Sequence, residues 1–347
     1  MRYLIFSDLH FHHTHHFSHI TREGFTVREL EHLSCADTIL KLCKEKNIDK
    51  VIFAGDAWGP VSDSMSAQTL VCLTDFTAKI AKEYPFDVLV GNHDLCTADT
   101  NIENNNIHKL YSLKYIPNVF VYDKPVEKDN IVYMPFCVSD EYAEAYLNAI
   151  QNKQEKVVIS HLEIKGIDLG NGIFSKKGID LELLKQFKYV FQGHYHSGSK
   201  YAKNVYVIGS TQRLFFKDLG KSRKNIIIYD TVKDTIERES FACPDWLTFT
   251  DENIDLLLKT DPNNYVKVEL STDILLTDEI KQHLQTFKGV SVHIDLNRIS
   301  VNKQIQEDVE ADSESDILRQ FINKSDNSEQ QKEALIEEGI RLLEKVK

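Results

Sequence analysis

The chain has 347 residues, of which 42% are hydrophobic and 27% charged, an ordinary composition for a soluble globular protein. Its formal net charge of −12 argues against a protein that coats nucleic acid. It does not argue against an enzyme that binds phosphate groups, because bound metal ions can make an acidic site attractive to phosphate. With no run of 18 apolar residues, no signal peptide and no Cys-x-x-Cys pair, we expect a cytoplasmic protein with reduced thiols and no membrane contact.

Short β-rich runs alternate with helical patterns over the first 230 residues, which predicts an α/β architecture. The predicted strands are Tyr3–Phe6, Val51–Ala54, Val88–Val90, Ile131–Met134, Val157–Ile159, Tyr189–Phe191, Val205–Ile208 and Ile226–Tyr229. The predicted helices between them are Leu30–Lys46, Ala67–Glu83 and Tyr142–Asn152.

The remainder of the chain divides into three parts. A strand, a helix and a strand at Tyr265–Leu270, Thr277–Phe287 and Val290–Ile294 suggest a small α+β unit. An acidic stretch without aromatic residues then reads as a linker, and two amphipathic helices follow, at Asp316–Asn323 and Ser328–Val346. We therefore predict a core at residues 1–240, a capping domain at 241–300, a linker at 301–315 and a helical segment at 316–347. The apolar faces of these two helices could pack on the capping domain. Because an acidic linker tethers the helices, docking on a partner protein is the preferred interpretation.

Five polar clusters follow predicted strands. They are Ser7-Asp8-Leu9-His10, Gly55-Asp56, Gly91-Asn92-His93-Asp94, Ser160-His161 and Gly193-His194-Tyr195-His196. Loops at the carboxyl ends of strands in an open α/β sheet converge on one crevice, so clusters distant in sequence should meet there. Glycine before Asp56, Asn92 and His194 is expected to permit the sharp turn that leaves the strand.

The residue types in these clusters are those of a dinuclear metal site. Carboxylate, imidazole and amide donors suit Mn²⁺, Fe or Zn²⁺ better than Ca²⁺ or Mg²⁺. Asp8 and His10 are two residues apart, as are His194 and His196, so each pair should lean to one side of an extended chain. Asp56 is a candidate bridge, because a carboxylate has two oxygens.

The order and spacing of the five clusters resemble the calcineurin-like metallophosphoesterase family. The resemblance implies a two-sheet α/β sandwich. It also implies one metal held by Asp8, His10, Asp56 and His196, and a second held by Asp56, Asn92, His161 and His194. His93 would protonate the leaving oxygen and Asp94 would orient His93. We expect two divalent ions, with manganese foremost and Fe²⁺, Zn²⁺ and Mg²⁺ as alternatives.

Within that family the chain looks like SbcD-type nucleases of bacteria and phages. Phosphoprotein phosphatases carry Asp-Arg-Gly after their Gly-Asp, whereas Ala57-Trp58-Gly59 follows Asp56 here. A core, a small α+β cap and a C-terminal helical tail match the layout of SbcD-type proteins, and Gly209-Ser210 resembles a turn in them. The resemblance implies 3′→5′ exonuclease activity on duplex DNA ends and endonuclease activity on single strands. The implied partners are an SbcC-type coiled-coil ATPase, bound through the C-terminal helices, and a second copy, with Ala67–Glu83 and Asp99–Leu113 as candidate dimer surfaces.

Simpler interpretations stay open for several residues. A single buried Asp or His usually has a structural role. Seven ligand-type residues at strand ends are unlikely to have gathered there by chance, so the structural interpretation does not explain the whole set. The histidines of the loop after His10 (His12, His13, His15, His16 and His19) could be a solvated loop or could touch substrate. A basic group could contact DNA or form an ordinary turn, and it comprises Arg213, Lys217, Lys221, Arg223 and Lys224. Two other functions are alternatives: another phosphodiesterase or phosphatase, and a non-catalytic scaffold of the same fold.

Overall fold

The computed structural model describes residues 1–11, 20–59, 66–96, 108–167, 174–214, 216, 224–271 and 275–294, and in the C-terminal part Ile322, Lys332, Glu333, Leu335 and Ile336. Residues 1–294 form one compact unit, and residues 295–347 form a second. The predicted linker, the histidines at positions 12–19, and all but these five residues of the two C-terminal helices lie outside the described residues. The partner-binding role of the tail therefore stays a prediction.

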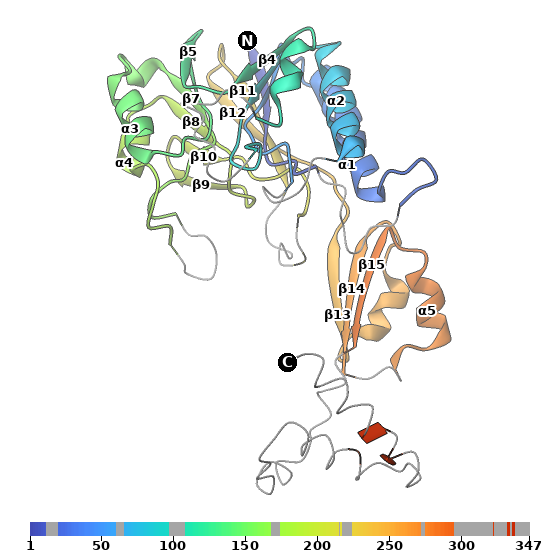
Figure 1. Ribbon diagram of the computed structural model, residues 1–347. Coiled ribbons are helices and arrows are strands. Elements are labelled where there is room, and N and C mark those ends of the chain that lie inside the picture. Colours follow the sequence, from blue (N-terminus) through green and yellow to red (C-terminus); the bar gives the residue numbers. More distant parts are fainter. Residues whose placement is uncertain are drawn as a thin grey trace, which may run out of the picture. The chain divides into compact units, whose positions relative to one another are not determined.

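The first sheet of the core has six strands in the order β12-β11-β1-β2-β3-β4. The strands β1 to β4 pair in parallel, and β11 and β12 extend the sheet in antiparallel fashion. The bounds are β1 Arg2–Phe6, β2 Lys50–Phe53, β3 Phe86–Leu89, β4 Val119–Tyr122, β11 Asn225–Asp230 and β12 Thr235–Ser240. Two helices, α1 (Val27–Glu45) and α2 (Ala67–Ala81), cover one face of this sheet (Figure 1).

The second sheet also has six strands, in the order β5-β6-β7-β8-β10-β9. Their bounds are β5 Val126–Lys128, β6 Ile131–Met134, β7 Val157–Ser160, β8 Tyr189–Gln192, β9 Ser199–Ala202 and β10 Val205–Val207. The helices α3 (Asp140–Ala149) and α4 (Leu181–Leu184) pack on its outer side (Figure 1). The core is therefore the two-sheet α/β sandwich that the sequence predicted.

Alternation along the strands explains the layers. Successive side chains of a strand point to opposite faces of the sheet. In β1, Leu4 and Phe6 accordingly pack beneath the helices α1 and α2, while Tyr3 and Ile5 pack against the second sheet. A strand that is covered on both faces is apolar at nearly every position. This is why the central strands were readily predicted: all eight are present within two residues of their predicted bounds.

The helices begin where their first residues can satisfy the free backbone N–H groups. Thr26 caps α1, and its side chain and that of Glu29 form a capping box. Ser66 caps α2 by accepting a hydrogen bond from Thr69 N–H at 3.0 Å. The helix α1 therefore starts three residues before the predicted Leu30, because the predicted bound followed the apolar pattern and not the cap.

A third, three-stranded sheet follows the core in the order β13-β14-β15, with all strands parallel. Its elements are β13 Trp246–Thr250, the short 3₁₀ helix η3 Ile254–Lys259, β14 Tyr265–Leu270, α5 Asp278–Leu284 and β15 Gly289–Ile294. Leu257, Val268, Ile280 and Phe287 belong to its own small core. The sequence predicted β14, α5 and β15, and it missed β13.

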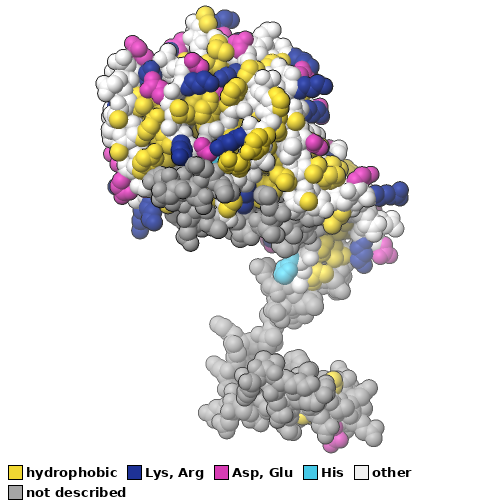
Figure 2. Space-filling view, turned by 45° about the horizontal axis from the view of Figure 1, so that its top comes forward, with side chains coloured by type: hydrophobic (Ala, Val, Ile, Leu, Met, Phe, Trp, Pro, Cys, Tyr) yellow, Lys and Arg dark blue, Asp and Glu magenta, His cyan; other side chains and the backbone are white. Residues whose placement is uncertain are grey.

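The surface of the core mixes charges of both signs. Figure 2 shows lysines and arginines interspersed with acidic and apolar side chains over one face of residues 1–294. Among the described helices, none combines the length and hydrophobicity that a membrane span requires.

Candidate metal centre

All five polar clusters lie at or just beyond strand ends, as predicted. Asp8 and His10 follow β1, Asp56 follows β2, and Asn92, His93 and Asp94 follow β3 in the first sheet. His161 follows β7, and His194 and His196 follow β8 in the second sheet. The first two loops run side by side, since the N–H groups of Asp8 and His10 donate to the carbonyl oxygens of Gly55 and Asp56 at 3.0 and 3.1 Å. The site therefore forms where both sheets end.

Four of the site residues have a left-handed backbone conformation. The φ angles are 56° at Asp8, 53° at His10, 60° at Asp56 and 72° at His194. Asp and His tolerate this region better than most residues, but it still costs free energy in a non-glycine residue. A gathering of such conformations at one edge is typical of a functional site, where the surrounding structure imposes them.

The glycines of the clusters serve mainly to leave room. A Cβ atom on Gly91 would lie 2.2 Å from Asp56 Oδ1, and one on Gly193 would lie 2.4 Å from Ser7 Oγ. At Gly55 a Cβ atom would lie 2.4 Å from His161 Nδ1. The φ angle is positive at Gly55 (97°), so the predicted turn explains that glycine. For Gly91 and Gly193 the structure gives a different reason, which is the close approach of neighbouring loops: Asp56 at Gly91, and Ala54 and Ser7 at Gly193.

One ligand group consists of Asp8, His10 and His196, whose donor atoms lie within 4.8 Å of one another. His10 Nε2 lies 3.1 Å from His196 Nε2, and these atoms lie 3.8 and 4.0 Å from Asp8 Oδ1. Both carboxylate oxygens of Asp8 are buried and accept no hydrogen bond. Buried carboxylates without donors are costly unless a cation compensates them, so this group fits a metal ion.

A second ligand group consists of Asp56, His161 and His194. His161 Nε2 lies 3.2 Å from Asp56 Oδ2 and 3.2 Å from Asn92 Oδ1, and His194 Nδ1 lies 2.9 Å from the same amide oxygen. His161 Nδ1 donates to the carbonyl oxygen of Ala54 at 2.6 Å, which leaves Nε2 as the atom that faces the site. All four predicted ligands of the second metal are thus gathered around one point.

Asp56 lies between the two groups. Its Oδ2 is 3.2 Å from His161 Nε2 and 3.7 Å from His10 Nε2. Its Oδ1 accepts a hydrogen bond from His93 N–H at 2.9 Å, which fixes the orientation of the carboxylate. The mixture of carboxylate, imidazole and amide donors around one shared carboxylate fits a pair of divalent ions.

The pKa values of the histidines reflect this crowding. Burial by itself would lower the pKa of His161, but the adjacent Asp56 carboxylate raises it to about 9. Burial and the neighbouring charge of His161 lower the pKa of His194 to about 4. Burial would raise the pKa of Asp56, but His161 and His10 hold it far below the ordinary range. Without metal, protons on imidazoles supply the positive charge that the carboxylates require.

His93 reaches the site from its more open side, with Nε2 4.0 Å from Asp56 Oδ2. Its Nδ1 lies 3.1 Å from the carbonyl oxygen of Gly59, which can only accept, so Nδ1 carries a proton. The prediction that Asp94 orients His93 is not what the structure shows. The Asp94 carboxylate instead accepts hydrogen bonds from the N–H groups of Asp56, Trp58 and Gly91 at 2.8–3.0 Å. Asp94 therefore joins the second and third loops, and the backbone of Gly59 orients His93.

The basic residues predicted to touch DNA have other partners where the structure describes them. Arg213 forms an ion pair with Asp245, with its Nε and a terminal nitrogen at 2.8 and 2.7 Å from the carboxylate. Lys224 is buried, and its ammonium donates to the carbonyl oxygen of His196 at 3.3 Å and to Ser210 Oγ at 2.8 Å. Lys224 thus holds the backbone of the loop that carries His196, a role that the sequence did not reveal. Lys217, Lys221 and Arg223 lie outside the described residues.

Comparisons with known proteins agree with this geometry. The calcineurin-like phosphoesterase family model matches residues 1–198. Exonuclease subunit 1 of Enterobacteria phage T4 is 28% identical over 267 residues, which are 72% of this chain and 73% of that protein. Putative phosphoesterase 244L of Invertebrate iridescent virus 6 is 26% identical over 212 residues, which are 57% of this chain and 70% of that protein.

Two solved structures also align. An archaeal phosphodiesterase has 14% identity and a TM-score of 0.33, covering 69% of this chain and 99% of that chain. The phosphoesterase Yfce from E. coli has 10% identity and a TM-score of 0.32, covering 70% of this chain and all of that one. The family model spans more than half of the chain, and the polar clusters within the matched residues meet at one site. This chain therefore belongs to the calcineurin-like phosphoesterases, a family of metal-dependent hydrolases of phosphate esters.

Proposed function

We propose that this chain is the metal-dependent nuclease subunit of a DNA end-processing and double-strand-break repair complex of the SbcCD type. The observation that carries the phosphodiesterase chemistry is the position of Asp56 between two groups of metal-binding side chains. The observation that favours DNA as the substrate is the similarity to the phage T4 protein named exonuclease subunit 1, which extends over 72% of this chain, well beyond the residues of the site.

In this proposal Asp8, His10, Asp56 and His196 hold one ion, and Asp56, Asn92, His161 and His194 hold the other. The bound pair would supply an activated water and positive charge that stabilises the attacking and leaving oxygens. The donors suit Mn²⁺, with Fe²⁺, Zn²⁺ and Mg²⁺ as alternatives. The protein itself contributes orientation, because the strained loops and the backbone hydrogen bonds of Asp94 fix the ligands before substrate arrives.

His93 is the proposed acid. Burial lowers the pKa of His93, which favours the neutral ring in the free protein. A phosphodiester anion beside Nε2 would raise the pKa again, which would let the charged ring donate its Nε2 proton to the leaving oxygen. The hydrogen bond from Nδ1 to Gly59 keeps Nε2 directed toward Asp56 and the substrate.

The finer parts of the proposal concern substrate and assembly. We infer 3′→5′ exonuclease activity on duplex ends and endonuclease activity on single strands. The protein would act as a homodimer, and residues 316–347 would bind an SbcC-type ATPase in the cytoplasm of a bacterium or phage-infected cell. Of the candidate dimer surfaces, α2 is described, whereas residues 99–107 lie outside the described part.

The first experiment is a nuclease assay with Mn²⁺ and an end-labelled duplex. Wild type should shorten the duplex, whereas His93→Ala should spare it while still binding two equivalents of Mn²⁺. Asp37→Ala, at an exposed position of α1, serves as the control that should cut normally. The substrate assignment fails if the protein, with and without its ATPase, hydrolyses an aryl phosphodiester but leaves DNA intact. A protein that binds no metal would indicate the scaffold alternative.

A further inference from the structure

A second surface of the core combines lysines with aromatic rings away from the ligand residues. It is a cavity of about 880 Å³ between the end of α4, the start of β8 and the hairpin formed by β9 and β10. Four lysines and three tyrosines line it, against one carboxylate among its described lining residues. The chain as a whole has a net charge of −12, so this concentration of positive charge differs from the general composition. We call this cavity the Lys–Tyr groove.

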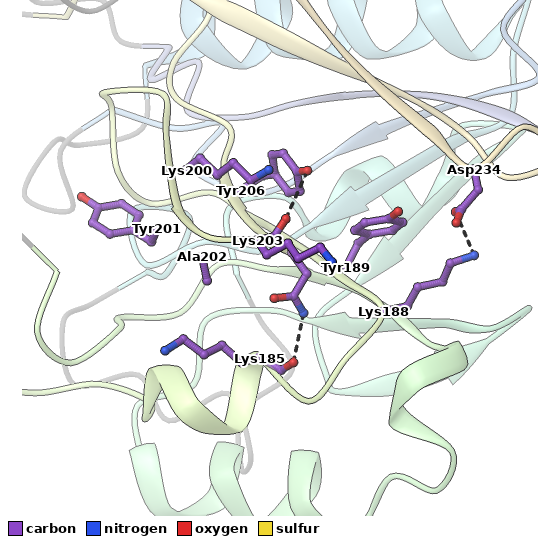
Figure 3. A pocket seen from close by; sticks show the side chains of 10 residues that line it. Lys185, Lys188, Tyr189, Lys200, Tyr201, Ala202, Lys203, Tyr206 and Asp234 are labelled. Atoms are coloured by element: carbon purple, nitrogen blue, oxygen red, sulfur yellow. Dashed lines mark hydrogen bonds and ion pairs between the residues drawn. The ribbon is translucent and has the colours of Figure 1, made fainter.

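The charges of the Lys–Tyr groove are only partly neutralised by the protein. Lys188 lies 2.8 Å from Asp234, and Lys185 lies 2.5 Å from Glu182. The ammonium of Lys200 instead lies over the ring of Tyr206, 4.6 Å from its centroid. Lys200 and Lys203 are both exposed, and they stand on or beside the edge strand β9 (Figure 3). An anion that enters the groove would therefore meet cations that are largely hydrated and available.

The aromatic rings are held in place by the surrounding structure. The ring of Tyr206 lies 5.8 Å from that of Phe191, centroid to centroid, and its hydroxyl donates to the carbonyl oxygen of Lys203 at 3.4 Å. Tyr189 makes an edge-to-face contact with Tyr206 at 6.3 Å. Tyr201 projects from β9 on the other side of the groove (Figure 3). Rings that are fixed before binding lose little entropy when a planar group stacks on them.

We propose that the Lys–Tyr groove binds single-stranded nucleic acid. Cations that track a phosphate backbone, interleaved with aromatic faces on which bases stack, are the two features of surfaces that bind single strands without reading sequence. The carboxylates of an acidic peptide would use the lysines but provide no ring that stacks on the tyrosines. Along the sequence the groove lies next to the metal centre, since Lys200 on β9 is four residues past His196. Binding there does not depend on the nuclease activity proposed above.

The test measures binding of a fluorescein-labelled oligothymidylate by anisotropy, with the full-length chain in EDTA so that no hydrolysis occurs. Lys200→Glu/Lys203→Glu should weaken binding at least tenfold and reduce the salt dependence, the slope of log K against log salt, by about 1.4, because two phosphate contacts are lost. The control Lys82→Glu/Lys259→Glu makes the same change in net charge at exposed positions outside the groove. It should change affinity less than threefold. Tyr201→Leu should weaken binding about tenfold through lost stacking.

Three outcomes would overturn the proposal. One is the absence of oligothymidylate binding by wild type, and another is equal weakening by the groove and control variants, which would reveal a general charge effect. The third is equal competition by polyglutamate at matched charge, which would identify an acidic peptide as the ligand. Hydrolysis of an aryl phosphodiester with Mn²⁺ should be unchanged in the groove variants and reports that they are folded. Failure of the nuclease assay would leave this binding result intact, so the two proposals can fail separately.

Discussion

Asp8 and Asp87 are both fully buried in the first-sheet half of the core, but their carboxylates have different surroundings. Asp87, on β3, receives the ammonium of Lys50 at 3.0 Å and the hydroxyl of Tyr133. Asp8, beyond the end of β1, has two oxygens that accept no hydrogen bond, and imidazoles are its nearest charged partners. The protein thus gives Asp87 an ammonium and a hydroxyl as partners, whereas Asp8 has only imidazoles near it and no hydrogen-bond donor, an arrangement that suits an added cation.

The sharpest test of this contrast compares Asp8→Asn with Asp87→Asn. Asp8→Asn should abolish binding of one Mn²⁺ ion and reduce phosphodiester hydrolysis at least a thousandfold, while the metal-free protein loses less stability than Asp87→Asn does. Asp87→Asn should cost about 3 kcal/mol of unfolding free energy, because Lys50 loses its charged partner, and should leave metal stoichiometry at two. Urea denaturation in EDTA and elemental analysis measure the two quantities. If Asp8→Asn were the more destabilising change without metal, the contrast would be wrong.

A smaller effect is expected from Gly91→Ala, which acts on the shared ligand by crowding. The added methyl group would lie 2.2 Å from Asp56 Oδ1, so that carboxylate must move. We expect a loss of hydrolysis of about a hundredfold and a destabilisation of about 1–3 kcal/mol. Gly24→Ala is the control for hydrolysis, since its new Cβ would contact nothing within 4 Å; its φ of 86° strains alanine, so some stability is lost there as well. Nearly normal kinetics for Gly91→Ala would show that Asp56 has more freedom than the structure indicates.

Lys224→Met should have a more modest effect, confined to the metal ion that His196 binds. The substitution removes the donor to the carbonyl oxygen of His196 and leaves a side chain of similar length in a buried position. Groups that orient ligands in this way typically contribute about tenfold to metal affinity. A Mn²⁺ titration should show this loss at one of two sites. Lys233→Met, at an exposed position, should bind both ions normally, and an equal loss there would contradict the assignment.

The smallest predicted effect concerns Asp123, a carboxylate that the protein pairs fully. Burial would raise its pKa, but His108 and Lys114, at 3.4 and 2.5 Å, lower it to about 2. A carboxyl whose pKa is depressed in the folded state stabilises the fold above its ordinary pKa of about 4 and loses that contribution as the pH falls to 2. Between pH 5 and 2, wild type should lose about 1 kcal/mol more than Asp123→Asn, after allowance for solvent screening. Parallel pH profiles of the two proteins, from urea denaturation, would refute this.

Much of the fold could be predicted because burial on both faces makes the central strands continuously apolar. The strands that were missed are mostly at edges or in the third sheet. The edge strand β12, for example, reads Thr-Ile-Glu-Arg-Glu-Ser and is largely exposed, so its pairing with β11 leaves little apolar signal. The strand β13 was missed for a related reason, since Trp246 and Phe249 are its only buried positions. An edge strand is recognised mainly by the strand with which it pairs, and a single sequence does not show which segments will pair.

For the site, the sequence by itself determined the candidate ligand types and their order, because each cluster follows a strand and parallel strands bring their carboxyl ends to one edge. Only the tertiary structure decided what holds those ligands. The sequence assigned Asp94 to orienting His93, a contact that the structure does not show, and it gave no sign that Lys224 would be buried behind a loop of the site. The distant partners of these two residues, Asp56 and Trp58 for Asp94 and His196 for Lys224, lie 28 to 38 residues away in the sequence. The local sequence sets which strand end a ligand follows, whereas the hydrogen bonds that orient it depend on which loops the packed sheets place side by side.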